Sequence, residues 1–353
     1  MRIAFVSFET VHHRASETNE RFRSVVELLR DRGHDVHVFC AQFWADEAGR
    51  LERDGITYHG VSVGLDACES FLLRLPVALR ATNPDVVHAG ANPPGQVLAA
   101  RSGATLSRAP LLVEWYGDGG VEGGRRRCLA ARASDRIVTP SELVRRKVRE
   151  LGADGNAVDV VPNGVDVERV RETDPGEEVD VVYARRLDAG ANLESLLLAL
   201  AELRDREWRA RVLGDGPERD AYEELAGDLR IDDRVEFAGD ASLDERIAAY
   251  RGAHVFAQTA QHCVFPTEML WALAAGCVGV VEYHTDSCAH ELLEGCERGF
   301  RTTSEEELAD VLLEARDLEH RDYDERFAEF DHEAVGERYL DAYRDLREDR
   351  GLF

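Results

Sequence analysis

Short runs of β-branched residues alternate with helical patterns along the whole chain, and this alternation restricts the fold more than any other feature. In the first half the predicted strands are residues 3–7, 36–40, 86–88, 111–114, 137–139 and 158–161. In the second half they are residues 181–184, 211–213, 235–238, 255–258 and 279–281. Strands separated by helices form parallel sheets covered by helices. The sequence therefore predicts an α/β fold with two parallel sheets.

A polar, acidic stretch at residues 168–180 separates the two halves and is typical of a linker. We therefore expect an N-terminal domain of residues 1–168 and a C-terminal domain of residues 169–334. A final helix is predicted within residues 335–353, with an apolar stripe suited to packing on another surface. The stripe consists of Val335, Tyr339, Tyr343 and Leu346. Open α/β units bind ligands at the carboxyl ends of their strands, so a central cleft between the domains is expected.

The charge of the chain excludes one class of partner. The sequence has 69 Asp and Glu against 43 Lys and Arg, which gives a formal net charge of −26. Such a field repels the phosphates of nucleic acids, so we expect no nucleic-acid partner. An acid-rich chain whose only lysine is Lys147 is typical of a high-salt cytoplasm, where screening weakens self-repulsion. The alternative is an acidic composition unrelated to salt.

The cysteines and the hydropathy pattern indicate a cytoplasmic location. The 7 cysteines are scattered and show no Cys-x-x-Cys spacing, which favours free thiols over disulfides or a zinc site. The longest apolar run, residues 269–281, is broken by two glycines and is too short to span a bilayer. The first residues do not have the pattern of a signal peptide.

Four stretches at predicted strand ends in the second half suit a phosphate group. They are Arg185-Arg186-Leu187-Asp188, Gly214-Asp215-Gly216-Pro217, Phe237-Ala238-Gly239 and Phe265-Pro266-Thr267-Glu268. Glycines and helix N-termini let backbone N–H groups approach a phosphate, and arginine adds a fixed positive charge. Each stretch alone is a weak signal, because strand-to-helix turns need glycine anyway. Their order and spacing together are much more specific.

With these motifs the sequence resembles glycosyltransferase family 4, and its composition resembles that of the family's halophilic archaeal members. The resemblance rests on segments spread over nearly the whole chain: residues 1–5, 32–36, 161–166, 186–188, 213–217, 235–239 and 272–276. It implies the GT-B fold, with two Rossmann-like domains facing a central cleft and a final helix that returns to the N-terminal domain. It also implies a retaining mechanism with the nucleotide-sugar bound mainly by the C-terminal domain and the acceptor by the N-terminal one.

The family motif G-R-L-x-x-x-K-G, which holds the donor diphosphate, is only partly kept. Arg186 matches the arginine, Ala191 stands at the lysine, and Arg185 stands at the first glycine. The resemblance assigns the catalytic role of stabilising the leaving group to Arg186, with Arg185 as a substitute cation. A solvated surface arginine is the alternative for Arg185. The paired glutamates of the family fall on Cys263 and Trp271.

Glu268 lies between those two positions, and we expect it to replace them as a contact for a sugar or ribose hydroxyl. Its alternative role is a first-turn glutamate that complements the helix dipole. Asp215 belongs to no D-x-D cluster, so no metal site and no cofactor besides the nucleotide-sugar co-substrate are predicted. The predicted donor-binding residues are Gly214, Asp215, Gly216, Phe237, Phe265, Thr267 and Glu268.

Polar side chains at strand ends of the first half form the predicted acceptor site. These residues are His13, Arg14, His88, Asn92 and Tyr116. Incidental exposure is the alternative for His13 and Arg14, and capping of the strand end is the alternative for Tyr116. His13 and Arg14 precede a helix for which Ser16 is the expected N-cap.

Residues 125–149 hold nine basic and two acidic residues, a local charge of +7 on an acidic chain. A basic amphipathic surface suits the anionic face of a membrane. We therefore expect peripheral association with the inner face of the cell membrane and a lipid-linked sugar acceptor; internal pairing of these arginines with acids is the alternative. The predicted membrane-facing residues are Arg125, Arg126, Arg127, Arg145, Arg146, Lys147 and Arg149.

These features predict a metal-independent glycosyltransferase that moves a hexose from a nucleotide-sugar to a glycan or lipid-linked sugar acceptor. The expected pathway is the biosynthesis of cell-surface glycans or glycoproteins. Loss of the family residues at Ala191, Cys263 and Trp271 favours an alternative, a catalytically silent GT-B subunit that acts as a scaffold or binding partner. A GT-B epimerase or phosphorylase is a third hypothesis.

Overall fold

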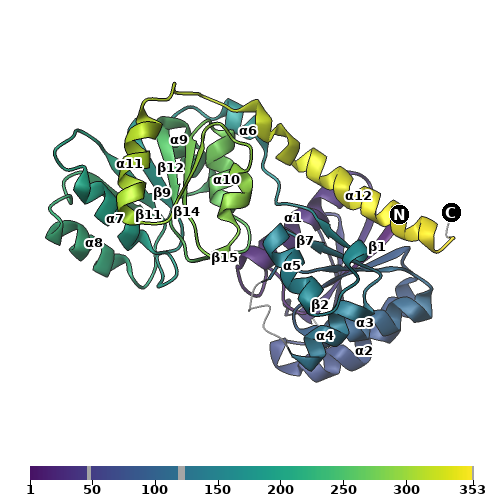
Figure 1. Ribbon diagram of the computed structural model, residues 1–353. Coiled ribbons are helices and arrows are strands. Elements are labelled where there is room, and N and C mark those ends of the chain that lie inside the picture. The colour runs from purple at the N-terminus through teal and green to yellow at the C-terminus, as the bar shows by residue number, and fades with distance from the viewer. Residues whose placement is uncertain (46–48, 118–123, 352–353) are drawn as a thin grey trace. The chain divides into compact units, whose positions relative to one another are not determined.

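The computed structural model describes residues 1–45, 49–117 and 124–351 (Figure 1). The chain divides into two compact units, one formed by residues 1–163 with 333–353 and the other by residues 164–332. The division lies at Asn163 and Gly164, a few residues ahead of the predicted boundary. Each unit is built on a largely parallel sheet, which confirms the predicted α/β class.

The first unit contains an eight-stranded sheet in the order β3-β4-β2-β1-β5-β6-β7-β8. Its strands are β1 (Arg2–Val6), β2 (Asp35–Gln42), β3 (Arg50–Arg53), β4 (Ile56–Val63), β5 (Val86–Gly90), β6 (Leu111–Glu114), β7 (Arg136–Thr139) and β8 (Val158–Val160). All neighbours are parallel except β3 and β4, which form an antiparallel edge. The sequence analysis missed both strands; β3 is short and mostly exposed, whereas β4 is longer and largely buried.

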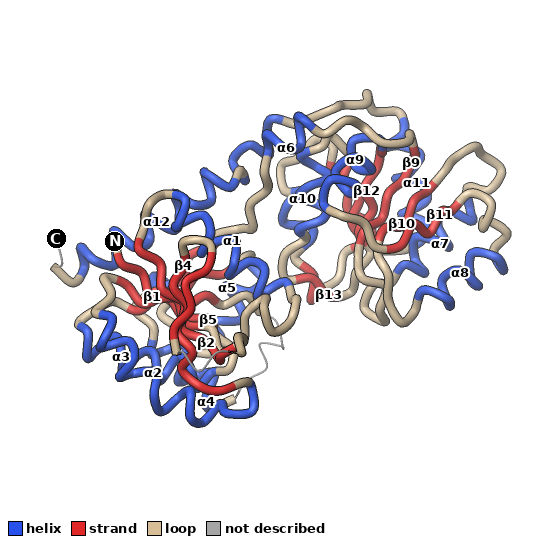
Figure 2. Tube along the Cα trace, turned by 180° about the vertical axis from the view of Figure 1, so that it is seen from behind, coloured by secondary structure: helices blue, strands red, loops and turns tan. Residues whose placement is uncertain are grey.

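Helices cover both faces of this sheet. They are α1 (Glu17–Asp31), α2 (Cys68–Thr82), α3 (Pro94–Ser107), α4 (Arg125–Ala133), α5 (Glu142–Glu150) and α12 (His332–Asp349), with 3-10 turns η1 (Leu65–Ala67) and η2 (Gly155–Ala157). The α2, α3 and α4 helices lie side by side on one face (Figures 1 and 2). The apolar stripe of α12 is buried in one core with α1, β1 and β2. Residues 352 and 353 of the predicted final helix lie outside the described residues.

The second unit contains a six-stranded parallel sheet in the order β11-β10-β9-β12-β14-β16. Its strands are β9 (Val179–Ala184), β10 (Ala210–Leu213), β11 (Val235–Gly239), β12 (Ala253–Gln258), β14 (Val278–Glu282) and β16 (Gly299–Thr302), and a separate pair is formed by β13 (His262–Cys263) and β15 (Asp286–Ser287). The sequence missed β16 and the small pair.

The helices of this unit are α6 (Val167–Glu172), α7 (Leu193–Glu202), α8 (Arg219–Asp228), α9 (Leu243–Gly252), α10 (Thr267–Ala274) and α11 (Glu305–Arg316), with 3-10 turns η3 (Ala289–Leu293) and η4 (Glu325–Phe330). The prediction of a linker over residues 168–180 is wrong for its first part, which forms α6. The Asp166 side chain caps this helix by accepting the N–H of Arg169, and Val167 and Val170 are buried. The two valines supply enough apolar contact to order an otherwise polar segment.

The strand order places one topological switch point in each sheet. In the second unit β9 lies between β10 and β12, so the chain leaves the carboxyl ends of β9 and β12 toward opposite sides. In open α/β sheets ligands bind at the crevice outside such a pair of strands. The crevice in this unit is bordered by residues 185–192 and 259–266. In the first unit the corresponding strands are β1 and β5.

Candidate functional site

Two glycines fix the shape of the loops at the carboxyl edge of the second sheet. Gly214 has φ 112°, and a Cβ atom there would lie 2.2 Å from the carbonyl oxygen of Arg185. A Cβ atom at Gly216 would lie 2.2 Å from the carbonyl oxygen of Leu187. Real side chains never approach a backbone oxygen so closely. Glycine is therefore required at both positions by the contact between the loops that follow β9 and β10.

Backbone hydrogen bonds join three consecutive loops at this edge. The N–H of Leu187 donates to the carbonyl of Asp215 over 3.0 Å, and the N–H of Gly214 donates to the carbonyl of Gly239 over 2.7 Å. The N–H of Gly216 donates to the Asp215 carboxylate over 2.6 Å. The predicted phosphate contacts through the amides of Gly214 and Gly216 are therefore wrong, because both N–H groups already have acceptors. The two glycines instead hold the loop that carries Arg185.

Arg185 and Arg186 lie in that loop and have different surroundings. Arg185 is partly buried, and its Nη2 donates to the carbonyl of His262 over 3.1 Å. Its guanidinium therefore crosses the crevice from the loop after β9 to the loop after β12, and its buried Nε atom makes no hydrogen bond. Arg186 is exposed, and no ion pair of its side chain occurs among the described residues. The loop after β9 thus carries one fixed cation and one exposed cation.

Ala191, at the position of the family lysine, is completely buried, and its carbonyl accepts the Tyr183 hydroxyl over 2.6 Å. Asn192 follows in the left-handed conformation, with φ 51°. Its Nδ2 donates over 3.0 Å to the carbonyl of Thr259 and over the same distance to the carboxylate of Glu282. The sequence did not indicate Glu282, because a single acid that ends an apolar run has the pattern of an ordinary strand end.

The start of α10 is held by packing and by one ion pair. The carboxylate of Glu268 accepts the Tyr250 hydroxyl and lies 3.3 Å from Nε of Arg246, so it ties α10 to α9. Burial and the Glu268 carboxylate raise the pKa of Tyr250 well above its ordinary value. Phe265 and Trp271 are buried, as is Cys263. Thr267 is partly buried and Phe237 is half-buried, its carbonyl accepting an N–H of the Arg219 guanidinium.

The predicted acceptor residues do not form one surface. His88 is completely buried, and its Nδ1 atom is hydrogen-bonded to the Tyr343 hydroxyl over 2.7 Å. The predicted contact of His88 with the sugar acceptor is therefore wrong. Strand position alone did not show that this face of β5 points into the core. Tyr116 is 2% exposed, and its hydroxyl accepts Nδ2 of Asn163 over 3.2 Å.

The remaining three lie in the loops after β1 and β5. His13 is half-buried and its Nδ1 accepts the N–H of Thr10, while Arg14 is exposed and pairs with Glu9 over 2.9 Å. Burial lowers the pKa of His13. Asn92 is exposed. The sequence missed Gln96, which is buried and joins these loops by accepting the N–H of Phe8 and donating to the carbonyl of Asn92.

A buried polar network lies in the same unit. Nε of Arg21 donates to Glu114 over 2.9 Å, and the Tyr339 hydroxyl of α12 donates to the second oxygen of this carboxylate over 2.8 Å. Burial alone would raise the pKa of Glu114, but Arg21, His88 and Tyr339 together lower it to about 2. Arg21 also donates to the side chain of Asn163, the last residue before the second unit. The network therefore joins α1, β6 and α12.

The basic segment covers α4, β7 and α5, and its charges are only partly neutralised. Arg145 pairs with Glu142 over 2.9 Å, and Arg136 pairs with Asp159. Four of the predicted membrane-facing residues are exposed and have no ion pair among the described residues: Arg125, Arg126, Arg146 and Arg149. Arg127 and Lys147 are partly buried.

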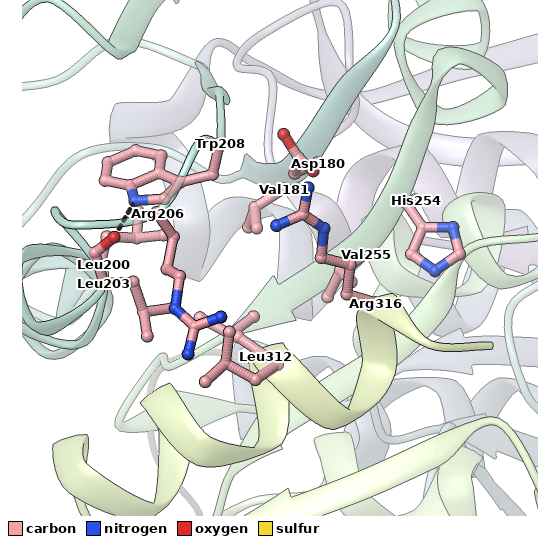
Figure 3. A pocket seen from close by; sticks show the side chains of 11 residues that line it. Asp180, Val181, Leu200, Leu203, Arg206, Trp208, His254, Val255, Leu312 and Arg316 are labelled. Carbon is pink, nitrogen blue, oxygen red and sulfur yellow. Dashed lines mark hydrogen bonds between the residues drawn. The ribbon is translucent and has the colours of Figure 1, made fainter.

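A separate small hollow, with a cavity volume of about 30 Å³, lies at the opposite edge of the second sheet (Figure 3). Asp180 and Val181 at the amino end of β9 line it, together with His254 of β12 and Leu312 of α11. It therefore lies outside the crevice formed by the carboxyl ends of the strands. In the described part of the chain no group of three His, Cys, Asp or Glu residues could hold a metal ion, and no helix there is long and apolar enough to cross a membrane.

Both units match known protein families. Residues 17–164 match the model of the glycosyl transferase 4-like domain, and residues 165–330 match that of the glycosyl transferases group 1. Two Rossmann-like units with these matches define a glycosyltransferase of the GT-B class. The chain belongs to glycosyltransferase family 4.

One curated relative is a D-inositol 3-phosphate glycosyltransferase of Nocardia farcinica, 32% identical over 168 residues. The alignment covers 42% of this chain and 37% of the relative, so the chain spans little more than a third of that protein. The fold is also similar to a sucrose-phosphate synthase of Thermosynechococcus elongatus, with a TM-score of 0.76, 16% identity and 99% of each chain covered. Anabaena HepE, solved in complex with UDP and glucose, has a TM-score of 0.72 and 16% identity over 98% of this chain and 100% of its own.

Proposed function

We propose that this protein transfers a hexose from a nucleotide-sugar to a glycan or lipid-linked sugar, with retention of configuration and without a metal ion. The observation that carries the proposal is the crevice of the second unit. Interlocked loops there hold the Arg185 guanidinium across the switch point beside the exposed Arg186. A switch point with two cations suits an anionic nucleotide.

In this mechanism the two arginines take the place of a metal ion. Arg186 stabilises the charge that develops on the leaving diphosphate, and Arg185 supplies the second cation that the family lysine provides. The acceptor hydroxyl attacks from the face on which the diphosphate departs, and a phosphate oxygen accepts its proton. No side chain of the protein is then needed as a general base. Thr267 and Glu268, in the first turn of α10, are the proposed donor contacts from this helix.

The donor is proposed to be a uridine diphosphate sugar. The similar structure of Anabaena HepE holds UDP and glucose, which makes UDP-glucose the first donor to test. The proposed pathway is the assembly of cell-surface glycans or glycoproteins in a cytoplasm of high salt concentration. The charge of −26 supports the salt assignment.

We also propose that the first unit binds the inner face of the cell membrane, where a lipid-linked acceptor is found. Exposed arginines of α4 and α5 supply attraction to anionic lipid. Large apolar side chains are exposed on the same unit, at the end of β4 and on η1, α2, α3 and α4. They are Val63, Leu65, Leu73, Val77, Leu106 and Leu129, and among the described residues the other exposed large hydrophobic is Tyr283.

The second candidate function is a scaffold without catalytic activity. The burial of Ala191, Cys263 and Trp271 at the positions of the family lysine and glutamates supports it. Calorimetric titration with UDP-glucose in molar KCl, followed by measurement of UDP release with and without a glycolipid acceptor, separates the two. Binding with acceptor-dependent release supports transfer. Binding without release supports the scaffold, and failure of a panel of nucleotide-hexoses to bind contradicts the proposed donor site.

A further inference from the structure

A buried carboxylate lies at the edge of the sheet where the nucleotide is proposed to bind. Glu282 is the last residue of β14, which neighbours β12, and it is 7% exposed. Its Oε2 atom accepts Nδ2 of Asn192, and its carboxylate also accepts a hydrogen bond from the Ser195 side chain. Both partners belong to the start of α7. A carboxylate from β14 therefore lies at the first turn of α7.

The N-terminus of α7, where this carboxylate lies, is a position that favours an anionic ligand. The N-terminus of a helix attracts negative charge, and Asn192 makes no side-chain cap to the backbone N–H groups of α7. The Asn192 amide also donates to the carbonyl of Thr259, in the loop that borders the crevice. Glu282 is thus connected to the crevice through a single side chain. A diphosphate bound there would bring a second negative charge toward this carboxylate.

The groups around Glu282 determine the pKa of its carboxyl group. Burial raises the pKa of Glu282, the Ser195 hydrogen bond and His284 lower it, and the like charge of Glu305 on α11 raises it. Nε2 of His284 lies 3.6 Å from the other carboxylate oxygen. The neighbouring end of β12 presents Gln258 and Thr259, which are neutral. A bound diphosphate would act in the same direction as Glu305, because like charges favour the protonated form.

We propose that Glu282 is a donor-site residue that takes up one proton from solvent when a nucleotide diphosphate binds in the crevice. This inference rests on the proposed function. While ionised, the carboxylate repels the diphosphate. Once protonated, it still accepts the Asn192 amide through its carbonyl oxygen, and it presents an O–H donor in place of a negative charge. Donor affinity is then linked to pH through a group outside the family motifs.

The test is isothermal calorimetry with UDP-glucose in buffers that differ in their enthalpy of ionisation, at fixed KCl. The two phosphates of UDP-glucose do not titrate near neutral pH, so proton uptake reports on the protein. We expect uptake with the wild type and none with Glu282→Gln, which keeps the hydrogen bond to Asn192. Above the pKa of Glu282 the variant binds more tightly than the wild type, and the wild-type affinity rises by at most about tenfold per pH unit as pH falls.

Two further variants make the result specific. Glu305→Gln removes a neighbouring carboxylate without touching Asn192, and His284→Gln removes the other titratable neighbour; both keep the proton uptake. Uridine, which has no phosphate, binds without uptake. Equal uptake by the wild type and Glu282→Gln, or its loss only in His284→Gln, overturns the inference and leaves the proposed function intact. Failure of both UDP-glucose and inorganic pyrophosphate to bind overturns the donor site and the inference together.

Discussion

The carbonyl oxygen of Arg185 lies so close to Gly214 that a Cβ atom on residue 214 would be only 2.2 Å from it. The glycine therefore does not serve as a flexible hinge. It lets the loop after β10 press against the loop that carries the two arginines. The position of the arginine loop thus depends on residue 214, at the end of β10, having no side chain.

Gly214→Ala tests this dependence. The substitution should destabilise the protein by about 1–3 kcal/mol from the left-handed backbone alone, and the clash with Arg185 adds to this cost. Gly227→Ala on α8 is the matched control, because nothing lies within 4 Å of its Cβ position and alanine favours a helix by about 0.5–1 kcal/mol. Urea unfolding and UDP-glucose titration should show lower stability and weaker binding for the first variant only. Equal stability and equal UDP-glucose affinity of the two variants would contradict the structural role of Gly214.

The roles of Arg185 and Arg186 can be distinguished, because the two side chains have different surroundings. Arg186→Ala removes an exposed cation, and we expect the rate of hexose transfer to fall by about 10²–10³ because the leaving group loses a positive charge. Arg185→Ala also breaks the hydrogen bond to His262 and should weaken donor binding as well. Arg204→Ala, an exposed arginine after α7, is the control. Steady-state kinetics with UDP-glucose gives the answer, and unchanged rates for both crevice variants would favour the scaffold.

The buried pair of Arg21 and Glu114 should dominate the acid sensitivity of the first unit. The pKa of Glu114 is about 2 in the folded protein, below its ordinary value of 4.5. Its stabilisation is therefore complete above 4.5 and is lost as pH falls toward about 2. Glu114→Gln leaves Arg21 buried without its counter-charge and should cost about 3–5 kcal/mol at neutral pH.

Urea unfolding at fixed KCl across this pH range measures the loss, which should be much smaller in Glu114→Gln. The control is Glu142→Gln, whose exposed pair with Arg145 should contribute less than about 0.5 kcal/mol. Parallel pH profiles for the wild type and Glu114→Gln would show that other carboxylates control the acid transition.

Most strands of the two parallel sheets follow from sequence patterns, whereas side-chain environments do not. The valine-rich runs that became β9 and β14 are buried on both faces, so their apolar composition alone indicates parallel strands. The Arg185 loop is found because arginines directly follow such a run. His88 is misassigned because a strand end does not show which face is covered, and Tyr343, which covers it, lies 255 residues away. Glu282 is missed for the same reason, since its partner Asn192 is 90 residues distant.

Salt should stabilise this protein. A net charge of −26 produces repulsion among surface carboxylates, and added ions screen it over a Debye length of about 10 Å at 0.1 M and about 3 Å at 1 M. We expect the thermal midpoint to rise steadily from low to molar KCl, and to rise similarly with NaCl. Differential scanning calorimetry at a series of concentrations measures it. A midpoint that is independent of KCl would contradict the assignment to a high-salt cytoplasm.

Membrane binding by the first unit should depend on apolar side chains as well as on arginines. Leu73 and Val77 of α2 are 79% and 70% exposed, so Leu73→Ser with Val77→Ser should leave the core intact. Each side chain contributes by entering the lipid interface, and burying it fully is worth about 1.5–3 kcal/mol. In vesicle flotation with anionic lipid at the lowest KCl that keeps the fold, the wild type should float and this double variant should float less.

The matched charge variant is Arg146→Gln with Arg149→Gln, which should lose flotation on anionic vesicles and regain part of it when the anionic lipid content is raised. Tyr283→Ser, which changes an exposed apolar residue of the second unit, should float like the wild type. Because screening weakens the attraction of the arginines but not apolar burial, higher KCl should affect the wild type less than it affects the α2 variant. Recovery of the wild type in the unbound fraction at every lipid composition would contradict membrane association and, with it, the proposed location of the acceptor.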